Sequence, residues 1–219
     1  MTHVAKAVNK IESADEPPTK DRIVDAAIDL FAEKGFEAVS MNEIASAVGI
    51  KKASIYFHFR SKDEIMEAIF DIFNDTIVRT GIRDEKYTDY LLDTVGLEGL
   101  MNASMGLVLK LGTDPKLGKI WRVTMLEASQ NEKFRAIFMQ NIWETPIATW
   151  ELLFERAIAK KLIKPGDPKL LAMEYFAFTW FAFVEHNLLR YNDTLAGKPV
   201  QSWEAISQHV RFLLDKIKE

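Results

Sequence analysis

The chain has 219 residues, of which 48% are hydrophobic and 27% are charged, and its formal net charge is −4 at pH 7. These values exclude wholesale disorder and are typical of a globular chain of one or two domains. The chain has no cysteine, which excludes disulfides, zinc–thiolate sites and thiol chemistry. On net charge alone, a mildly acidic chain is not typical of a nucleic-acid-binding protein.

The first 18 residues are polar and end in Pro17-Pro18, so we expect residues 1–18 to form a disordered leader. They lack the apolar core of a secretory signal peptide. The most apolar run, residues 170–184, is shorter than the roughly 20 residues that a membrane span needs, and Glu174 interrupts it. We therefore expect a cytoplasmic protein with no membrane partner.

Apolar residues recur with helical spacing in nearly every segment, which predicts an all-α fold. The first helix is expected to begin with Thr19 as its N-cap and to end at Gly35. The second helix is expected to begin at Ser40, with Glu43 completing a capping box, and to end at Gly49.

A short third helix is expected over residues 52–59, and a fourth helix is expected to begin after Ser61. Proline and glycine positions divide the remaining chain. At Thr145-Pro146 the sequence leaves open whether one helix ends and another begins or a single helix is kinked. The further helices are expected near residues 88–111, 115–129, 131–144, 146–162, 168–191 and 201–217.

Residues 41–59 have the spacing of a helix-turn-helix. Ala45 is small enough for two helices to cross closely, and Gly49 is suited to the turn between them. Between Ile44 and Lys62 there are four basic residues and no acidic residue, which favours contact with phosphates. Phe57 and Phe59 are expected to face the core. The side chains expected to hold the two helices together are Ile44, Val48, Ile50 and Ile55.

The segment from Thr19 to about Phe73 resembles the DNA-binding domain of the TetR/AcrR family of transcriptional regulators. Three patterns carry this resemblance: A-x-x-L-F-x-x-x-G-F in the first helix, I-A-x-x-x-G-I at the turn, and Y-x-H-F-x-x-K in the recognition element. The resemblance implies a helix-turn-helix domain over residues 19–65 and a larger helical domain for ligand binding and dimerisation over residues 66–219. It also implies a homodimer that binds a palindromic operator in double-stranded DNA.

The resemblance assigns DNA-binding roles to individual positions. Lys52, Ala53 and Ser54 occupy the positions that meet base edges, although Lys52 could equally rest on a phosphate. Tyr56 and His58 occupy positions that usually contact phosphate, and Lys62 matches a lysine that holds the backbone. The residues predicted to contact DNA are Ser40, Asn42, Lys51, Lys52, Ala53, Ser54, Tyr56, His58 and Lys62.

The larger domain is rich in aromatic residues, and the resemblance implies that its middle helices enclose an effector cavity. Each candidate lining residue could equally belong to a filled core. Methionine and aromatic side chains would suit a small apolar or amphipathic effector. Glu127, Glu144, Glu151 and Glu174 are candidates for meeting a cationic ligand instead. The predicted lining residues are Met101, Met105, Trp121, Met125, Phe138, Trp150 and Phe178.

The resemblance further implies that the last two helices form a four-helix bundle with a second copy of the chain. The last helix has apolar residues at alternating steps of three and four, as helix-packing seams do. The residues predicted to take part in dimerisation are Phe181, Leu188, Trp203, Ile206, Val210, Leu213 and Ile217.

The sequence predicts no metal site and no cofactor, since its four histidines are scattered. It contains no recognisable catalytic motif, so we expect a regulator and not an enzyme. The predicted function is that of a ligand-responsive regulator, most often a repressor in such families. A ligand carrier that has lost DNA binding, or an all-α enzyme, are the alternative classes.

Overall fold

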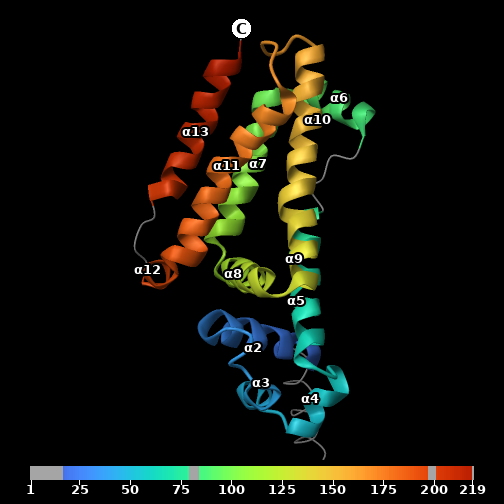
Figure 1. The fold of residues 1–219 in the computed structure, drawn as a ribbon, viewed down its shortest axis with the longest axis vertical. Coiled ribbons are helices and arrows are strands. Elements are labelled where there is room, and N and C mark those ends of the chain that lie inside the picture. The colour runs from blue at the N-terminus through green and yellow to red at the C-terminus, as the bar shows by residue number, and fades with distance from the viewer. Residues whose placement is uncertain (1–16, 79–83, 197–200, 219) are drawn as a thin grey trace, which may run out of the picture. The chain divides into compact units, whose positions relative to one another are not determined.

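The computed structural model describes residues 17–78, 84–196 and 201–218, and every regular element within these ranges is a helix (Figure 1). The predicted all-α fold class is confirmed. The chain divides into two compact units, residues 1–69 and 70–219. Helix α5 (Lys62–Val78) contributes its first half to one unit and its second half to the other. Nearly all of the predicted leader lies outside the described residues.

The first unit contains α2 (Thr19–Lys34), α3 (Met41–Val48), α4 (Lys52–His58) and the start of α5. The predicted N-cap of the first helix is wrong. The N-cap is Pro18, whose carbonyl accepts hydrogen bonds from the backbone N–H groups of Asp21 and Arg22 at 2.9 and 3.1 Å. The helix therefore begins one residue earlier than predicted, without a side-chain cap. Its predicted end is confirmed, because Gly35 follows with a φ of 83°.

The second unit is a helical bundle in which α10 and α13 both pack against α11, and α13 also packs against α7 (Figure 1). Its elements follow one another with short connections. They are α6 (Glu85–Thr94), α7 (Gly96–Thr113), α8 (Pro115–Gln130), α9 (Glu132–Phe138), the π-helical turn η2 (Met139–Glu144), α10 (Thr145–Ala159), α11 (Pro168–Val184), the π-helical turn η3 (Glu185–Leu189), α12 (Tyr191–Leu195) and α13 (Gln201–Ile217).

One expected helix of this unit differs in the structure, and at Pro146 one of the two alternatives that the sequence left open is observed. The single helix expected over residues 88–111 is two helices, because Gly96 has a φ of 75° and breaks the hydrogen-bonding pattern between α6 and α7. At Pro146 the chain remains helical from Glu132 to Ala159. The turn η2 ends at Glu144, two residues before this proline, and the backbone N–H of Thr145 donates to the carbonyl of Gln140. The widened turn therefore lies just N-terminal to the residue that has no N–H to donate.

The C-terminal half of α5 is packed against α9 by stacked rings. The Phe70 ring lies 4.7 Å from the Phe134 ring with an interplanar angle of 7°. Phe73 stacks in the same way on Phe138 at 6.0 Å. These side chains place one end of α5 within the hydrophobic core of the second unit.

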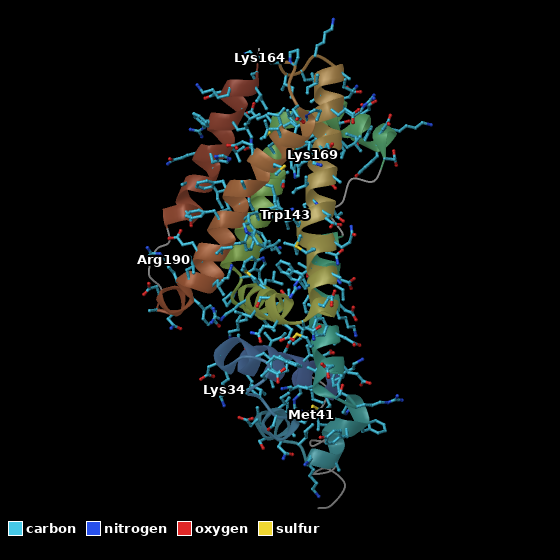
Figure 2. The ribbon with its side chains drawn as sticks, in the orientation of Figure 1. Lys34, Met41, Trp143, Lys164, Lys169 and Arg190 are labelled. Atoms are coloured by element: carbon cyan, nitrogen blue, oxygen red, sulfur yellow. The ribbon has the colours of Figure 1, made fainter. Side chains whose placement is uncertain are left out.

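A polar contact reinforces this packing. The side-chain amide of Asn141 donates to that of Asn74 at 2.7 Å, which joins η2 to α5. Figure 2 shows Trp143, also from η2, on the side of this helical run that faces α11.

Candidate nucleic-acid interface and ligand cavity

Helix α3 begins with the predicted capping box. The Ser40 hydroxyl accepts a hydrogen bond from the Glu43 backbone N–H at 3.2 Å, and the Glu43 carboxylate accepts one from the Ser40 backbone N–H at 2.9 Å. The same carboxylate accepts from the Ser40 hydroxyl at 3.0 Å. These bonds from Ser40, with a smaller contribution from Lys34, lower the pKa of Glu43. Ser40 is exposed, but its hydroxyl already has a structural role at the start of α3.

We expect Ser40→Ala to lower the free energy of unfolding by about 1 kcal/mol at pH 7, because the start of α3 loses its cap. Because folding lowers the Glu43 pKa, the stability that this carboxylate contributes is present above its unfolded value of 4.5 and is lost as the pH falls through its folded value. The variant keeps the backbone N–H of residue 40 and loses only the bond from the hydroxyl to this carboxylate. The part of the difference between wild type and variant that comes from this bond should therefore shrink as the pH falls below 4.5. Urea denaturation at pH 7 and pH 3.5 measures both effects. Ser46→Ala, on the exposed side of the same helix, is the matched control.

Gly49 ends α3 in the left-handed region, with φ 76° and ψ 27°, as predicted. Ile55 on α4 is fully buried and Val48 nearly so, which confirms them as core residues that join the two helices. Arg22 from α2 donates to the carbonyl of Val48 at 2.7 Å and fixes the last turn of α3. The expected helix-turn-helix is therefore present.

One face of α4 is exposed and carries most of the predicted DNA contacts. Phe59 is buried, as predicted, but the same expectation for Phe57 is wrong because its ring is 87% exposed. Its edge lies against the His58 ring at 5.3 Å. Of the remaining predicted residues, His58 is half-buried and the following are exposed: Asn42, Lys51, Lys52, Ala53, Ser54 and Tyr56.

Lys62 differs from the residues on this face because its side chain bonds to the protein itself. Its ammonium group donates to the carbonyls of Phe36 and Glu37 and lies 4.2 Å from the centre of the Phe36 ring. An ammonium group has three donors, so these two bonds commit most of its hydrogen-bonding capacity. In this structure Lys62 stabilises the turn between α2 and α3.

The second unit contains a cavity of about 490 Å³ that is partly open to the surface. Of the predicted lining residues, Trp121 and Trp150 are in its wall, whereas Met101, Met105 and Phe138 are buried behind it and Met125 and Phe178 lie elsewhere. The walls come from α5, α6, α7, α8, η2, α10 and α11. The lining residues that sequence reasoning missed include Phe73, Thr76, Leu91, Ser104, Leu107, Asn141, Thr145, Thr149, Tyr175 and Trp180.

The wall that α6 provides is held in place by ion pairs with α10. Arg156 donates through Nε to Asp89 at 2.8 Å, and Lys160 pairs with Asp93 at 2.8 Å. The hydrogen bond from Arg156 lowers the pKa of Asp89. These pairs position Tyr87 on α6 at the cavity.

The predicted dimerisation residues of α13 require revision. Ile206, Val210, Leu213 and Ile217 are buried within a single chain, where α13 packs on α11 and α7, so they have no surface left for a second copy. The side chain of Trp203 lies outside the described residues, and Leu188 is half-buried. Phe181 is 55% exposed. The other large apolar side chains exposed on these elements are Leu170, Met173, Leu189 and Phe212.

Residues 17–78, 84–196 and 201–218 contain no group of three acidic, histidine or cysteine side chains placed to hold a metal ion. None of the described helices combines the length and the apolarity that crossing a membrane requires.

Residues 23–69 match the family described as bacterial regulatory proteins, tetR family. IcaR of Staphylococcus epidermidis, a negative transcriptional regulator of the biofilm operon icaADBC, is 41% identical over 73 residues, which make up 32% of this chain and 38% of IcaR. IcaR of Staphylococcus aureus is 40% identical over 80 residues, or 35% of this chain and 41% of the relative. The matched segment thus spans about two fifths of the length of these curated relatives.

Solved structures resemble the chain over most of its length. The SmeT–triclosan complex has a TM-score of 0.65 at 20% identity and covers 92% of both chains, and SmeT is a repressor from Stenotrophomonas maltophilia. A regulator from Saccharomonospora viridis in complex with choline has a TM-score of 0.65 at 21% identity, covering 91% of this chain and 97% of that one. The resemblance to the TetR/AcrR family is confirmed for the helix-turn-helix, since residues 23–69 match that family. The fold of most of the chain resembles that of a TetR family transcriptional regulator from Pseudomonas syringae, with a TM-score of 0.62 at 20% identity, covering 94% of this chain and 98% of that one.

Proposed function

We propose that the chain is a DNA-binding transcriptional repressor that acts in the cytoplasm as a homodimer on a palindromic operator and is released by a small effector. The observation that carries this proposal is the face of α4, which is exposed, basic and free of acidic residues between Ile44 and Lys62. Such a face can meet DNA phosphates without repulsion from carboxylates. The family match supports a regulator and not an enzyme, and IcaR, a negative regulator, supports repression.

Within this proposal, Lys51, Tyr56 and His58 hold phosphates, while Lys52, Ala53 and Ser54 meet base edges in the major groove. Phe57 joins this face, because an exposed apolar ring beside base-reading residues suits contact with thymine methyl groups or sugars. Ser40 and Asn42 support the backbone contacts from the start of α3. Lys62 acts mainly by fixing the turn that carries α3, through its bonds to Phe36 and Glu37.

The homodimer is supported by the apolar side chains that α11, η3 and α13 leave exposed. Leu170, Met173 and Phe181 follow one another at helical spacing along α11, and Phe212 is exposed on α13. A stripe of this kind is what a second copy would cover in an isologous interface. We still propose a four-helix bundle between two copies, but with the exposed side chains of α11, η3 and α13 at the interface in place of the buried side chains of α13.

The effector site proposed here is the cavity of the second unit. Phe73 and Thr76 of α5 are part of its wall, and α5 also belongs to the DNA-binding unit. A bound ligand therefore contacts the element shared by both units. The neighbours solved with triclosan and with choline support a small-molecule effector of this fold. An effector that binds the DNA-free form more tightly would release the operator.

The decisive test is DNA binding by the full chain to a duplex selected from a random pool by repeated rounds of binding. Lys51, Lys52 and the exposed Arg60 of both subunits would bring six cations close to the phosphate backbone, with Lys52 doing so from within the groove. Log affinity should therefore fall against log salt with a slope of about −5. Tyr56→Ala should lower affinity about tenfold for every duplex, because it removes a positioning contact. Lys52→Ala should instead change the preferred sequence.

Electrophoretic mobility shifts between 50 and 200 mM salt measure both quantities, and Tyr56→Phe separates the hydroxyl from the ring. Affinity that is weak and independent of salt would overturn the proposal and favour a ligand carrier. An unchanged affinity in Tyr56→Ala would show that α4 docks differently.

A further inference from the structure

The cavity of the second unit is lined by uncharged side chains. Among the described residues that line it, none is an aspartate, glutamate, lysine, arginine or histidine. The four glutamates considered for a cationic ligand, Glu127, Glu144, Glu151 and Glu174, are all absent from this lining. Burying a charge in an apolar space without a partner is costly, so such a cavity selects against ions of either sign.

Its two ionisable lining groups are phenols. Burial raises the pKa of Tyr175 to about 12, and a hydrogen bond with Ser104 offsets this only in part. The Tyr175 hydroxyl donates to the backbone carbonyl of Met101 at 3.0 Å. Tyr175 therefore stays neutral and hydrogen-bonded over the physiological pH range.

Aromatic rings form much of the wall, and they pack on one another. The rings of Trp121 and Phe183 stack at 5.4 Å, and the Trp150 ring lies 4.2 Å from that of Tyr175. Trp180 meets Trp121 edge-on at 5.8 Å. A cation is bound by the open faces of several rings, but here neighbouring rings cover part of those faces. Flat apolar molecules can instead fit against ring edges and remaining faces.

A polar strip crosses this apolar surface. Asn141, Thr145 and Thr149 follow one another along η2 and α10, and Thr76 adds a hydroxyl from α5. The Thr76 hydroxyl donates to the carbonyl of Ile72, and the Thr145 hydroxyl accepts from Gln140. Such groups can orient a ligand through one or two hydrogen bonds, but they cannot neutralise a charge.

We propose that the cavity binds an uncharged, largely aromatic molecule with one or two hydroxyl, carbonyl or arylamine groups, and that it excludes organic cations and anions of the same shape. This inference rests on the proposed function only for the consequence of binding, since binding itself can be measured without DNA. The volume of about 490 Å³ accommodates two or three fused or linked rings.

The test compares three probes with one ring skeleton on the DNA-free full chain. They are N-phenyl-1-naphthylamine, which is uncharged, its anionic analogue 8-anilino-1-naphthalenesulfonate, and an analogue that carries a trimethylammonium group. Probe fluorescence and quenching of protein tryptophan both report binding. We expect the uncharged probe to bind at least about 100-fold more tightly than either ion, because only the ions lose hydration without gaining a partner. An ion that binds as tightly as the uncharged probe would overturn the inference.

A pair of variants tests whether the probe binds in the cavity. Thr149→Glu introduces a carboxylate into the wall and should weaken the uncharged probe at least tenfold while tightening the cationic one. Thr149→Gln, which is of similar size and uncharged, should retain the wild-type preference. Circular dichroism melting checks that both variants fold. Equal probe affinities in the two variants would show that the probe binds elsewhere, which also overturns the inference.

The outcome is separable from that of the regulatory proposal. If the chain binds the uncharged probe selectively but does not bind DNA, this inference stands and the proposed regulatory function is overturned. If the chain binds DNA with the expected salt dependence but binds an ionic probe more tightly than the uncharged one, the regulatory function stands and this inference is overturned.

Discussion

Replacing both Lys51 and Lys52 with glutamate is expected to reduce DNA affinity by at least about 1,000-fold at 100 mM salt. Each charge-assisted hydrogen bond contributes about 1.5 kcal/mol, and a dimer would lose two from each subunit. The new carboxylates also repel the phosphates from an exposed face that contains no acidic residue in the wild type. Fluorescence anisotropy with the selected duplex measures the change. The slope of log affinity against log salt should decrease in magnitude by about 4.

The matched control makes the same change in charge elsewhere. Lys116 and Lys169 are exposed lysines of the second unit, so Lys116→Glu with Lys169→Glu alters the net charge equally (Lys169 is labelled in Figure 2). We expect this variant to bind DNA within a few-fold of wild type. A similar loss in both variants would mean that net charge, and not the face of α4, governs the affinity.

Phe134→Ala is expected to lower the free energy of unfolding of the second unit by about 3–5 kcal/mol. The Phe134 ring is 1% exposed and stacks on Phe70 of α5, so its removal leaves a cavity at the point where α5 enters this core. That loss is a large share of the roughly 5–15 kcal/mol that stabilises a typical domain. Chemical denaturation followed by tryptophan fluorescence measures it, since the five tryptophans all lie in the second unit.

Two further variants serve as controls for Phe134→Ala. Phe134→Leu retains much of the buried volume and should cost clearly less than alanine. Phe57→Ala removes a ring of the same size that is 87% exposed, and should change stability by no more than about 0.5 kcal/mol. A small effect of Phe134→Ala would mean that the core of the second unit does not depend on the stack with α5.

The parts of the fold that sequence reasoning predicted correctly are those with local causes. The capping box of Ser40 and Glu43 and the helix ends at Gly35 and Gly49, both with positive φ, each depend on residues within a few positions of one another. Gly96 also has a local cause, its positive φ, but the sequence predicts that it lies inside one helix over residues 88–111, which is wrong.

The sites were harder to predict, because they depend on contacts between distant segments. Periodicity identified apolar residues of α7 and α13 but could not say which neighbour covers them. Met101 is therefore behind the cavity wall, and Ile206 and Val210 are inside the protomer. The spacing of Phe57 and Phe59 predicts that both rings face the core, but only one side of the short helix α4 is covered and Phe57 lies on the other side. Its position two residues after the buried Ile55 indicates the exposed side.

The π-helical turn η2 has a consequence for the register of the long helical run that contains it. Its buried residues advance in steps of four from Phe134 to Phe138 and Ile142, and then by five to Ile147. In an α-helix the extra residue would rotate the following side chains by about 100° around the axis. The wider π-helical turn accommodates the extra residue without this rotation. The continuous helical run can therefore pack against α5 through α9 and line the cavity through α10. The five-residue step is visible in the sequence, so relatives that share this cavity wall can be recognised by their spacing even where individual side chains differ.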